Sequence, residues 1–558
     1  MDIHSYARPD RVRVRHLELS LDVRFDRRIL EGTAAVHVER LDGNELILDT
    51  RDLAIHSVDN AASFELGTAD SILGAPLRIQ LVPGADWVRI HYSTSPRASG
   101  LQWLEPPQTA GKRHPFVYTQ SQAIHARSWI PVQDTPGVRL TFAADIRVPG
   151  GLRAVMGAGR SNGRFRMDHP IPSYLISLAA GDLEFRDLGP RSGVWAEPPL
   201  LAMAAEEFAD TEAMMRAVEA LYGPYRWGCY DLLVLPPSFP FGGMENPCLT
   251  FTTPTVLAGD RSLVSLVAHE LAHSWSGNLV TNATWSDFWL NEGFTVYVER
   301  RVLEALYGPA RAEMEAVLGR RELDREMESL PEKDTVLHLD LKDRDPDDGC
   351  TLVPYEKGAL LLRTIEQSAG RAGFDAFLRA YFDHFAFQSI TTADFLEYLR
   401  RELPTNVPVE DWIFKPGVPP GAAEPHSDAF ERVESAWPSA DAAWSTHEWL
   451  HFLRSQPDSP DMERLEREFH FTESRNSEIL HQWLLMAVEH GYQPAYPRME
   501  EFLASVGRRK FLKDIYTELM KTEAGRELAG KIYKRARPGY HPIAQATLDA
   551  IVNPPAAS

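Results

Sequence analysis

The sequence has few cysteines and no long apolar run, and both shortages exclude classes of protein. The three cysteines, Cys229, Cys248 and Cys350, include no closely spaced pair, so we expect no disulfide framework and a reducing compartment. No stretch of about 18 apolar residues occurs, which argues against a membrane span. The opening stretch MDIHSYARPDRVRVRHLELS is charged throughout and lacks the apolar core of a signal peptide. We therefore expect a cytoplasmic protein.

Positive charge is also scarce relative to negative charge. The 558 residues include 58 Lys and Arg against 79 Asp and Glu, which gives a formal charge of −21. Such a surface repels phosphate groups, so neither nucleic acid nor an anionic membrane is expected as a partner. Apolar residues make up 44% of the chain and charged residues 25%, the composition of ordinary globular domains. At about 150 residues per domain, the length predicts three or four domains.

The first region of the chain, up to about residue 183, has the pattern of β-strands. The stretches VRVRHLELSLDVRF and ILEGTAAVHVERL alternate apolar and polar residues, and PLRIQLVPGADWVRIHY predicts two strands around Pro-Gly. These patterns indicate an N-terminal β domain over residues 1–183.

A mixed α/β region follows, and the tail is helical. YDLLVLPP predicts a buried strand, and the helical spacing predicts helices over 262–276, 286–307 and 355–368. The segment KPGVPPGAAEP is rich in Pro and Gly and is a linker candidate. Beyond it, EILHQWLLMAVEH and YPRMEEFLASVG have helical period. We expect a multidomain α+β protein with an α/β domain over 184–425 and a C-terminal α-helical domain over 426–558.

The stretch VAHELAHSW carries the strongest chemical signal. His269 and His273 are four residues apart, so a helix places both imidazoles on one face, one turn apart. The spacing H-E-x-x-H is typical of zinc metalloproteases. Gly277 and Asn278 are expected to end this helix. The pair therefore predicts two ligands of one zinc ion.

A catalytic zinc usually has a third protein ligand from a separate element. The next helix offers Asp287, Glu292 and Glu299. Glu292 lies in LNEG, between apolar residues, where an unpaired carboxylate would be costly to bury, and it is our choice. Glu299 lies two turns further along the same face, where it can hydrogen-bond a ligand histidine. We expect one zinc ion per chain, held by His269, His273 and Glu292.

Glu270 directly follows His269 and is too close to share its metal. It can reach a zinc-bound water instead. Zinc lowers the pKa of such a water to about 7, and a neighbouring carboxylate can take its proton during attack on a carbonyl. Glu270 is therefore predicted to be the general base in metal-assisted hydrolysis of an amide.

The segment GGMENP, Gly242 to Pro247, precedes HELAH and NEG at the spacing of the gluzincin M1 zinc aminopeptidases. PPSFPFGGMENPCLTF, SQAIHARSWIPVQDTP, VPYEKGALLL and GRRKF resemble the leukotriene A4 hydrolase and aminopeptidase B branch of that family. The resemblance extends over nearly the whole chain. It implies a saddle-like β domain, a thermolysin-like catalytic domain and an α-helical C-terminal domain.

The resemblance also implies the substrate contacts. Glu245 is similar to the glutamate that binds the free α-amino group, and the glycines before it let backbone approach backbone, as in strand addition. The implied substrate-binding residues are Gln120, Gln122, Gly242, Gly243, Met244, Glu245, Asp347, Arg508 and Lys510.

Tyr355 in VPYEKG matches the catalytic tyrosine of the family, whose phenol donates to the oxyanion. Asp347 matches a pocket aspartate that serves both epoxide opening and recognition of a basic first residue. Two positions depart from the leukotriene hydrolase pattern, because Phe241 and Cys350 stand where that group has tyrosines. The departures put the lipid activity in doubt and leave the peptidase residues intact.

Arg508 and Lys510 align with a pair that, in this branch, resembles a recognition site for the C-terminal carboxylate of the peptide. A guanidinium can bind a carboxylate through two parallel hydrogen bonds. Held at both ends, short peptides would then be preferred over long chains.

The sequence predicts a zinc-dependent aminopeptidase that removes the N-terminal residue of short peptides, acting as a monomer or weak oligomer. One alternative is a bifunctional epoxide hydrolase and aminopeptidase with a lipid substrate. Another is a catalytically silent scaffold on the same fold, which could have lost Glu270 or Tyr355 but retains both. Endopeptidase activity is a further alternative, opposed by Glu245.

Overall fold

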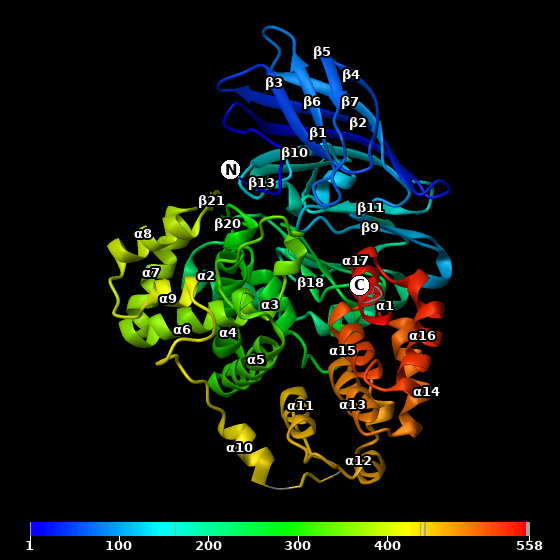
Figure 1. Ribbon diagram of the computed structural model, residues 1–558, viewed down its shortest axis with the longest axis vertical. Coiled ribbons are helices and arrows are strands. Elements are labelled where there is room, and N and C mark those ends of the chain that lie inside the picture. Colours follow the sequence, from blue (N-terminus) through cyan, green and yellow to red (C-terminus); the bar gives the residue numbers. More distant parts are fainter. Residues whose placement is uncertain (1, 162, 436, 440–441, 554–558) are drawn as a thin grey trace.

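The N-terminal third of the chain consists of β-sheets (Figure 1). The computed structural model describes residues 2–161, 163–435, 437–439 and 442–553. A seven-stranded sheet has the order β12-β13-β10-β1-β2-β7-β4. Its strands are β1 (Val12–Arg24), β2 (Ile29–Arg40), β4 (Ala54–Asp59), β7 (Trp87–Ser93), β10 (Arg139–Arg147), β12 (Gly159–Ser161) and β13 (Arg164–Pro172). Two smaller sheets contain β3 (Glu45–Thr50), β6 (Ala75–Leu81) and β5 (Ala61–Leu66), and β11 (Arg153–Met156), β14 (Leu178–Gly181), β9 (Phe116–Thr119) and β8 (Leu101–Leu104).

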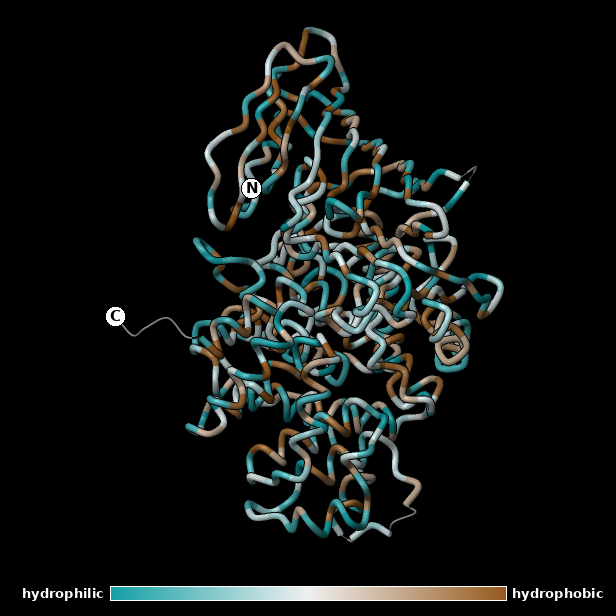
Figure 2. Tube along the Cα trace, turned by 90° about the vertical axis from the view of Figure 1, so that its right-hand side faces the viewer, coloured by the Kyte–Doolittle hydropathy of each residue, from teal (hydrophilic) through white to brown (hydrophobic). Residues whose placement is uncertain are grey.

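The alternating pattern of the sequence explains these strands. β1 buries Val12, Val14, Leu17 and Leu19, and the break in the period falls where the register against β2 shifts, between Val14 and His16. Polar and apolar positions are interleaved along these strands in Figure 2. The two strands predicted around Pro-Gly are confirmed as β6 and β7, but they pair in different sheets.

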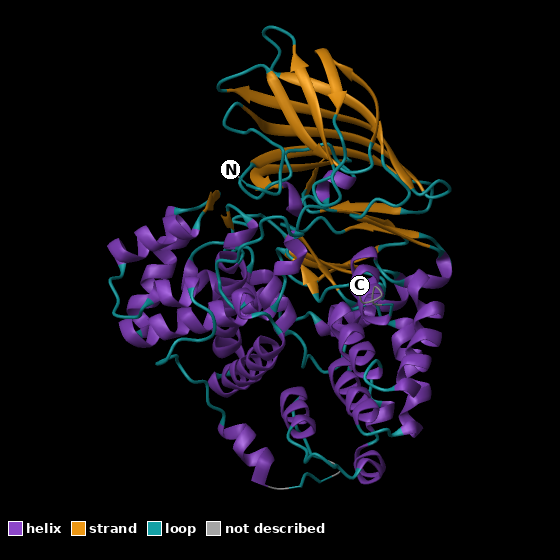
Figure 3. Cartoon of the chain, viewed as in Figure 1, coloured by secondary structure: helices purple, strands orange, loops and turns teal. Residues whose placement is uncertain are grey.

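The middle of the chain combines a five-stranded and a two-stranded sheet with helices (Figure 3). The five-stranded sheet has the order β15-β16-β17-β19-β18, with β18 at its edge. Its strands are β15 (Glu184–Asp187), β16 (Ser192–Ala196), β17 (Tyr230–Val234), β18 (Gly243–Met244) and β19 (Leu249–Thr252), and β20 (Val280–Asn282) pairs with β21 (Gln388–Ile390). The helices are α1 (Pro198–Glu207), α2 (Thr211–Tyr222), α3 (Ser265–Ala272), α4 (Trp289–Tyr307), α5 (Pro309–Ser329), α6 (Gly358–Ala369), α7 (Arg371–His384), α8 (Thr392–Glu402) and α9 (Val409–Phe414).

The helix that carries the two histidines ends earlier than predicted. α3 stops at Ala272 rather than near residue 276, and His273 is its C-cap. Helix-like bonds continue for one turn, with Ser276 N–H donating to the Ala272 carbonyl at 3.1 Å. Gly277 then adopts a φ of 102°, a backbone conformation that favours glycine.

The C-terminal part is helical and has its own apolar core. Its helices are α10 (Asp428–Ser435), α11 (Thr446–Arg454), α12 (Met462–Phe469), α13 (Ser477–Glu489), α14 (Tyr496–Ser505), α15 (Arg509–Leu519), α16 (Glu523–Ala536) and α17 (Pro542–Val552). Trp483 and Phe511 belong to this core, which is separate from the continuous core of the first two parts. The predicted sequence of a β part, a mixed part and a helical part is therefore confirmed.

Two backbone hydrogen bonds attach the C-terminal part to the loop before β18. Gly507 N–H donates to the Pro237 carbonyl and Arg509 N–H to the Pro240 carbonyl, both at 2.7 Å. A Cβ at position 507 would come within 3.0 Å of the Ser238 backbone, so this approach requires glycine. The contact places Arg508 beside the middle sheet.

The three cysteines are free thiols. None of the described helices combines the length and the apolar composition that a bilayer crossing requires.

Candidate active site

His269 and His273 face each other through their Nε2 atoms, which lie 3.2 Å apart. Each ring has an acceptor at its other nitrogen. His269 Nδ1 lies 3.0 Å from the Glu299 carboxylate, and His273 Nδ1 lies 3.1 Å from the Ser276 carbonyl. The acceptors place the imidazole hydrogens on Nδ1. Two Nε2 lone pairs therefore point into the same small space.

Glu292 on α4 supplies a third atom to this space. Its Oε2 lies 3.4 Å from His269 Nε2 and 3.6 Å from His273 Nε2, and it has no hydrogen-bond donor among the described residues. Three lone-pair atoms without an intervening hydrogen repel one another unless a cation lies between them. Two imidazole nitrogens and one carboxylate oxygen form a donor set that suits catalytic zinc.

Asp287 and Glu299, the other two candidates for the third zinc ligand, occupy other positions. Asp287 accepts hydrogen bonds from the Thr284 hydroxyl and the Thr392 N–H, and it pairs with His338. Glu299 hydrogen-bonds His269 Nδ1, the contact that the sequence suggested for it. The structure thus brings Glu292, and neither alternative, to the two Nε2 atoms.

Glu270 lies against the edge strand β18. Its carboxylate is so close to Gly243 that a Cβ there would come within 3.0 Å of it. The side chain is buried, and burial together with the charges of Glu245 and Glu292 raises the pKa of Glu270 well above its usual range. A divalent cation among these groups would lower the pKa again. Glu270 is therefore placed beside both the donor set and the strand that a peptide would meet.

Glu245 and Gln120 present unpaired acceptors beside that strand. Glu245 is 3% exposed, and its Oε1 has no donor among the described residues; the same holds for Gln120 Oε1. Gln120 also contacts the Met244 sulfur at 3.3 Å. Unsatisfied buried oxygens are costly, and an ammonium has three N–H donors to satisfy them. Gln122 is half-buried on the same loop.

Tyr355 lies in a π-helical turn, Val353–Lys357, before α6. Its ring stacks on His269 with 6.1 Å between centroids and meets the edge of Phe288 at 6.0 Å. Burial, followed by the charge of Glu292, raises the pKa of the phenol well above its usual range. Tyr355 therefore keeps its hydrogen and can donate it toward the metal-ligand cluster. Such π-helical turns are frequent at functional sites.

Asp347 and Cys350 lie on the next wall of the site. Burial and the negative charges of Asp347 and Glu292 raise the pKa of the Cys350 thiol. Asp347 accepts hydrogen bonds from His125 and from the Ala123 N–H. His125 lies in the segment SQAIHARSWIPVQDTP, but no spacing in the sequence relates it to Asp347.

Arg508 lies at the other end of β18. A Cβ on Gly242 would be 3.3 Å from Arg508 Nη2. Arg508 Nη1 donates to Glu478 at 2.8 Å, so one arm of the guanidinium is already bound to a carboxylate. Lys510 Nζ lies 3.7 Å from both Glu322 and Glu478. Despite burial, Lys510 and Arg508 hold the pKa of Glu478 at about 2. Of the pair, Arg508 is the residue that reaches the strand.

Three family models match the chain. The Peptidase M1 N-terminal domain matches residues 13–168, the Peptidase family M1 domain 206–412 and the Leukotriene A4 hydrolase C-terminal domain 444–552. A leukotriene A-4 hydrolase of Xenopus laevis is 39% identical, covering 98% of both chains. Aminopeptidase B of Mus musculus is 41% identical over 78% of this chain and 73% of its own. A solved structure of yeast LTA4 hydrolase with bestatin has a TM-score of 0.92 at 33% identity, covering 99% and 97% of the two chains.

Proposed function

The chain belongs to peptidase family M1, in the branch of leukotriene A4 hydrolase and aminopeptidase B, and we propose which of its residues remove the first residue of short peptides. It is a zinc metallo-aminopeptidase, and the family uses one catalytic zinc. His269, His273 and Glu292 are the proposed ligands. When bound, zinc polarises the scissile carbonyl and makes water acidic enough to deprotonate near neutral pH.

The unpaired oxygen of Glu245 carries the exopeptidase assignment. Among the described residues, no donor pairs with Glu245 Oε1, which is buried close to the metal-ligand cluster, or with Gln120 Oε1. A free α-ammonium supplies the missing donors and a compensating charge. A peptide bound in this way has its first carbonyl near the cluster, whereas an internal segment of a long chain leaves Glu245 buried and unpaired. Gln122 is the proposed further contact from the same loop.

The remaining roles follow from position. The peptide backbone lies along the edge strand formed by Gly243 and Met244, where a carbonyl and an N–H are free to pair. Glu270, next to Gly243, takes the proton from the attacking water and passes it to the departing amine. Tyr355 donates its phenol hydrogen to the oxygen on which negative charge develops.

Three residues set the proposed substrate range. Asp347 attracts a basic first side chain. Arg508 Nη2, beside Gly242, donates to the C-terminal carboxylate of a short peptide, while Nη1 stays on Glu478. Lys510 adds positive charge near that end.

The alternative is a lipid epoxide hydrolase that also has aminopeptidase activity, because relatives are named leukotriene A4 hydrolase. Asp347 is compatible with it. The leukotriene hydrolases of the family have tyrosines at the positions of Phe241 and Cys350. Burial raises the pKa of the Cys350 thiol, which therefore stays protonated. These residues favour the peptidase.

We also propose a cytoplasmic location, which the sparse, free cysteines support, and a monomer or weak oligomer. The proposed domain limits are 1–183, 184–425 and 426–558. Ala429 and Phe430 of α10 pack on α5, so the third domain begins in contact with the second.

The test is a panel of aminoacyl fluorogenic substrates, assayed with and without a zinc chelator, together with an N-acetylated peptide. We expect chelator-sensitive release of the first residue and very poor cleavage of the blocked peptide. Efficient cleavage of the blocked peptide would show that the exopeptidase assignment is wrong. Glu245→Gln should weaken amide hydrolysis strongly, since the charge-assisted contact to the ammonium is lost.

A further inference from the structure

Asp347 is held from one side by the loop that follows β9. Its Oδ2 accepts a hydrogen bond from His125 Nε2 at 3.0 Å, and its Oδ1 accepts one from the Ala123 N–H at 3.2 Å. The same loop carries Gln120 and Gln122. Each carboxylate oxygen keeps a further lone pair, and 23% of the Asp347 side chain is exposed. Asp347 can therefore accept hydrogen bonds from a ligand as well.

Arg51 fixes the tautomer of His125. Arg51 Nη1 lies 3.1 Å from His125 Nδ1, and a guanidinium has donors only, so Nδ1 must be the acceptor. The Ser99 hydroxyl accepts from Arg51 at 3.2 Å and lies 2.8 Å from Nδ1, where its hydrogen can share the Nδ1 lone pair with Arg51. The imidazole hydrogen is therefore on Nε2, where it points at Asp347. A second hydrogen on Nδ1 would face the guanidinium, so the Arg51 contact favours the ring that carries its only hydrogen on Nε2.

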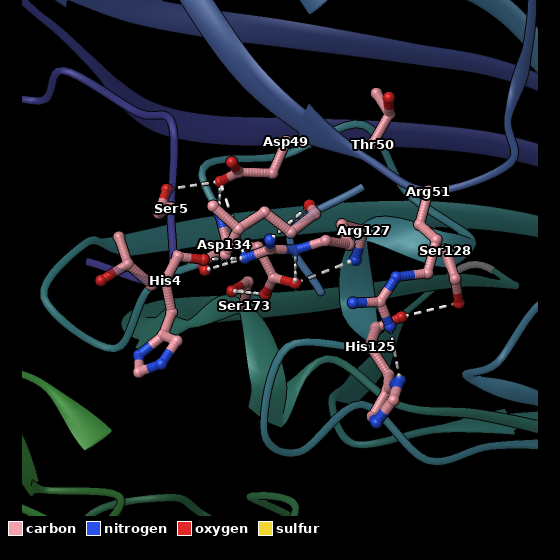
Figure 4. A network of polar contacts seen from close by, with 12 residues as sticks. His4, Ser5, Asp49, Thr50, Arg51, His125, Arg127, Ser128, Asp134 and Ser173 are labelled. Carbon is pink, nitrogen blue, oxygen red and sulfur yellow. Dashed lines mark hydrogen bonds and ion pairs between the residues drawn. The ribbon is translucent and has the colours of Figure 1, made fainter. Parts of the chain in front are cut away.

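Arg51 is itself held in place by the N-terminal domain. Its backbone N–H donates to the Arg127 carbonyl at 2.8 Å, and its Nη2 donates to the Ile72 carbonyl. Arg127 is fully buried and paired with Asp134 at 3.0 Å. Figure 4 shows this network, with the Arg51 guanidinium directed at His125. The direction of the His125 ring is thus set by a domain that contributes none of the proposed metal ligands.

A neutral donor leaves the Asp347 charge in place. An imidazolium at His125 would form an ion pair and cancel the carboxylate, whereas the neutral Nε2–H only orients it. The hydrogen bonds from His125 Nε2 and from the Ala123 N–H both favour the ionised form of the Asp347 carboxylate. The nearby His541 is kept neutral by burial, which lowers its pKa to about 3. Asp347 is therefore an oriented anion at neutral pH.

Resting on the aminopeptidase function above, we propose that His125 is a positioning residue that orients an uncancelled Asp347 carboxylate and so gives the enzyme a preference for peptides with a cationic first side chain. Arg51 holds His125 in the tautomer that this role requires.

Two amide variants of His125 test the proposal. Glutamine places its NH2 near the position of Nε2 and can still reach Asp347, whereas asparagine reaches only as far as Nδ1. The measured quantity is the ratio of kcat/KM for an arginyl anilide to that for a leucyl anilide. We expect His125→Gln to keep the wild-type ratio within about threefold and His125→Asn to lose it by about tenfold, the range of one charge-assisted hydrogen bond. The loss should lie in KM for the arginyl substrate.

Asp347→Asn should lose the arginyl preference as His125→Asn does, and His114→Gln, an exposed histidine of the same region, should leave the ratio unchanged. Leucyl hydrolysis by each variant reports the peptidase itself. If the wild type hydrolyses neither anilide, the proposed function is wrong, and so is the inference that rests on it. A wild type that hydrolyses both without preferring the arginyl anilide, or a His125→Asn protein with the wild-type ratio, overturns the inference alone.

One measurement does not depend on whether the variants fold. In NMR spectra of the wild-type enzyme labelled with 15N-histidine, His125 should appear as a neutral Nε2–H ring at pH 7. Its signal can be assigned by its response to an arginine-containing inhibitor, or by its absence from the spectrum of His125→Gln. An imidazolium signal for His125 at that pH would contradict the proposed role.

Discussion

Arg300 and Glu356 form a half-buried ion pair that joins two walls of the active site. Arg300 Nη2 lies 2.8 Å from one carboxylate oxygen of Glu356 and 2.6 Å from the other. Arg300 directly follows Glu299, which holds His269, and Glu356 directly follows Tyr355. The pair therefore fixes the distance between α4 and the turn that carries the tyrosine.

Gly319 on α5 leaves room for this ion pair, and Gly319→Ala should disturb it. A Cβ at position 319 would lie within 3.0 Å of the Glu356 oxygens and of Arg300 Nη2. We expect kcat to fall roughly ten- to a hundredfold, because small displacements of catalytic groups have effects of that size. An ordinary glycine-to-alanine change within a helix stabilises by about 1 kcal/mol, so a lower Tm would support the clash. Gly530→Ala, in open space on α16, is the control, and equal kinetics for the two variants would contradict the prediction.

His273→Ala should abolish stoichiometric zinc binding. The change removes one of three converging donor atoms, and the remaining histidine and Glu292 are too few for a tight site. Metal analysis of purified protein should find one zinc per wild-type chain and much less in the variant. Full occupancy in His273→Ala would mean that the ligand set is wrong.

Glu270→Gln should separate the base from the ligands. The amide has nearly the same shape but accepts no proton, so we expect zinc content to stay at the wild-type level. The value of kcat should fall by about a hundredfold to ten-thousandfold, the usual contribution of a general base. Wild-type turnover with normal zinc content would assign the base elsewhere.

Arg508→Ala should discriminate between substrates with and without a terminal carboxylate. For a tripeptide we expect kcat/KM to fall by roughly tenfold or more, the value of a hydrogen bond to a charged group. An aminoacyl anilide, which has no carboxylate, should change little. Lys513→Ala, exposed on α15, the helix that begins directly after Arg508, is the matched control. Equal losses on both substrates would place Arg508 outside substrate recognition.

Lys357 should make stability depend on pH. Its ammonium is buried and donates to the Thr335 and Lys415 carbonyls, and burial lowers its pKa to about 7, against about 10.4 in an unfolded chain. Between these values the unfolded chain binds more protons, so the free energy of unfolding rises with pH through that window. Below pH 7 both states are protonated and the full cost of burying the charge remains.

The measurement is the Tm of the wild type minus that of Lys357→Met, taken from pH 6 to pH 9. We expect this difference to increase with pH, by an amount that corresponds to at most about 3 kcal/mol between pH 7 and pH 9, because one pKa unit corresponds to about 1.4 kcal/mol. The exposed Lys333→Met is the control and should give a flat difference. If the Tm difference for Lys357→Met is also independent of pH, then burial does not lower the pKa of Lys357.

The elements and the two histidines could be predicted because they depend on local spacing. Period-two alternation located β1 and β2, and the four-residue spacing placed His269 and His273 on one face whatever the rest of the chain does. The end of α3 was predicted less well, since Gly277 marks the turn after the helix rather than its last residue.

Distances between segments were decided by the tertiary structure alone. Asp287, Glu292 and Glu299 share one sequence neighbourhood, and only the packing of α4 against α3 aims Glu292 at both Nε2 atoms. His125 lies 222 positions from Asp347 in the sequence, and no periodicity relates them. Arg508 needed the backbone bonds of Gly507 and Arg509 to reach β18. Sequence spacing determines the direction of side chains within one element, whereas the meeting of two elements depends on the whole packed core, which has no local signature.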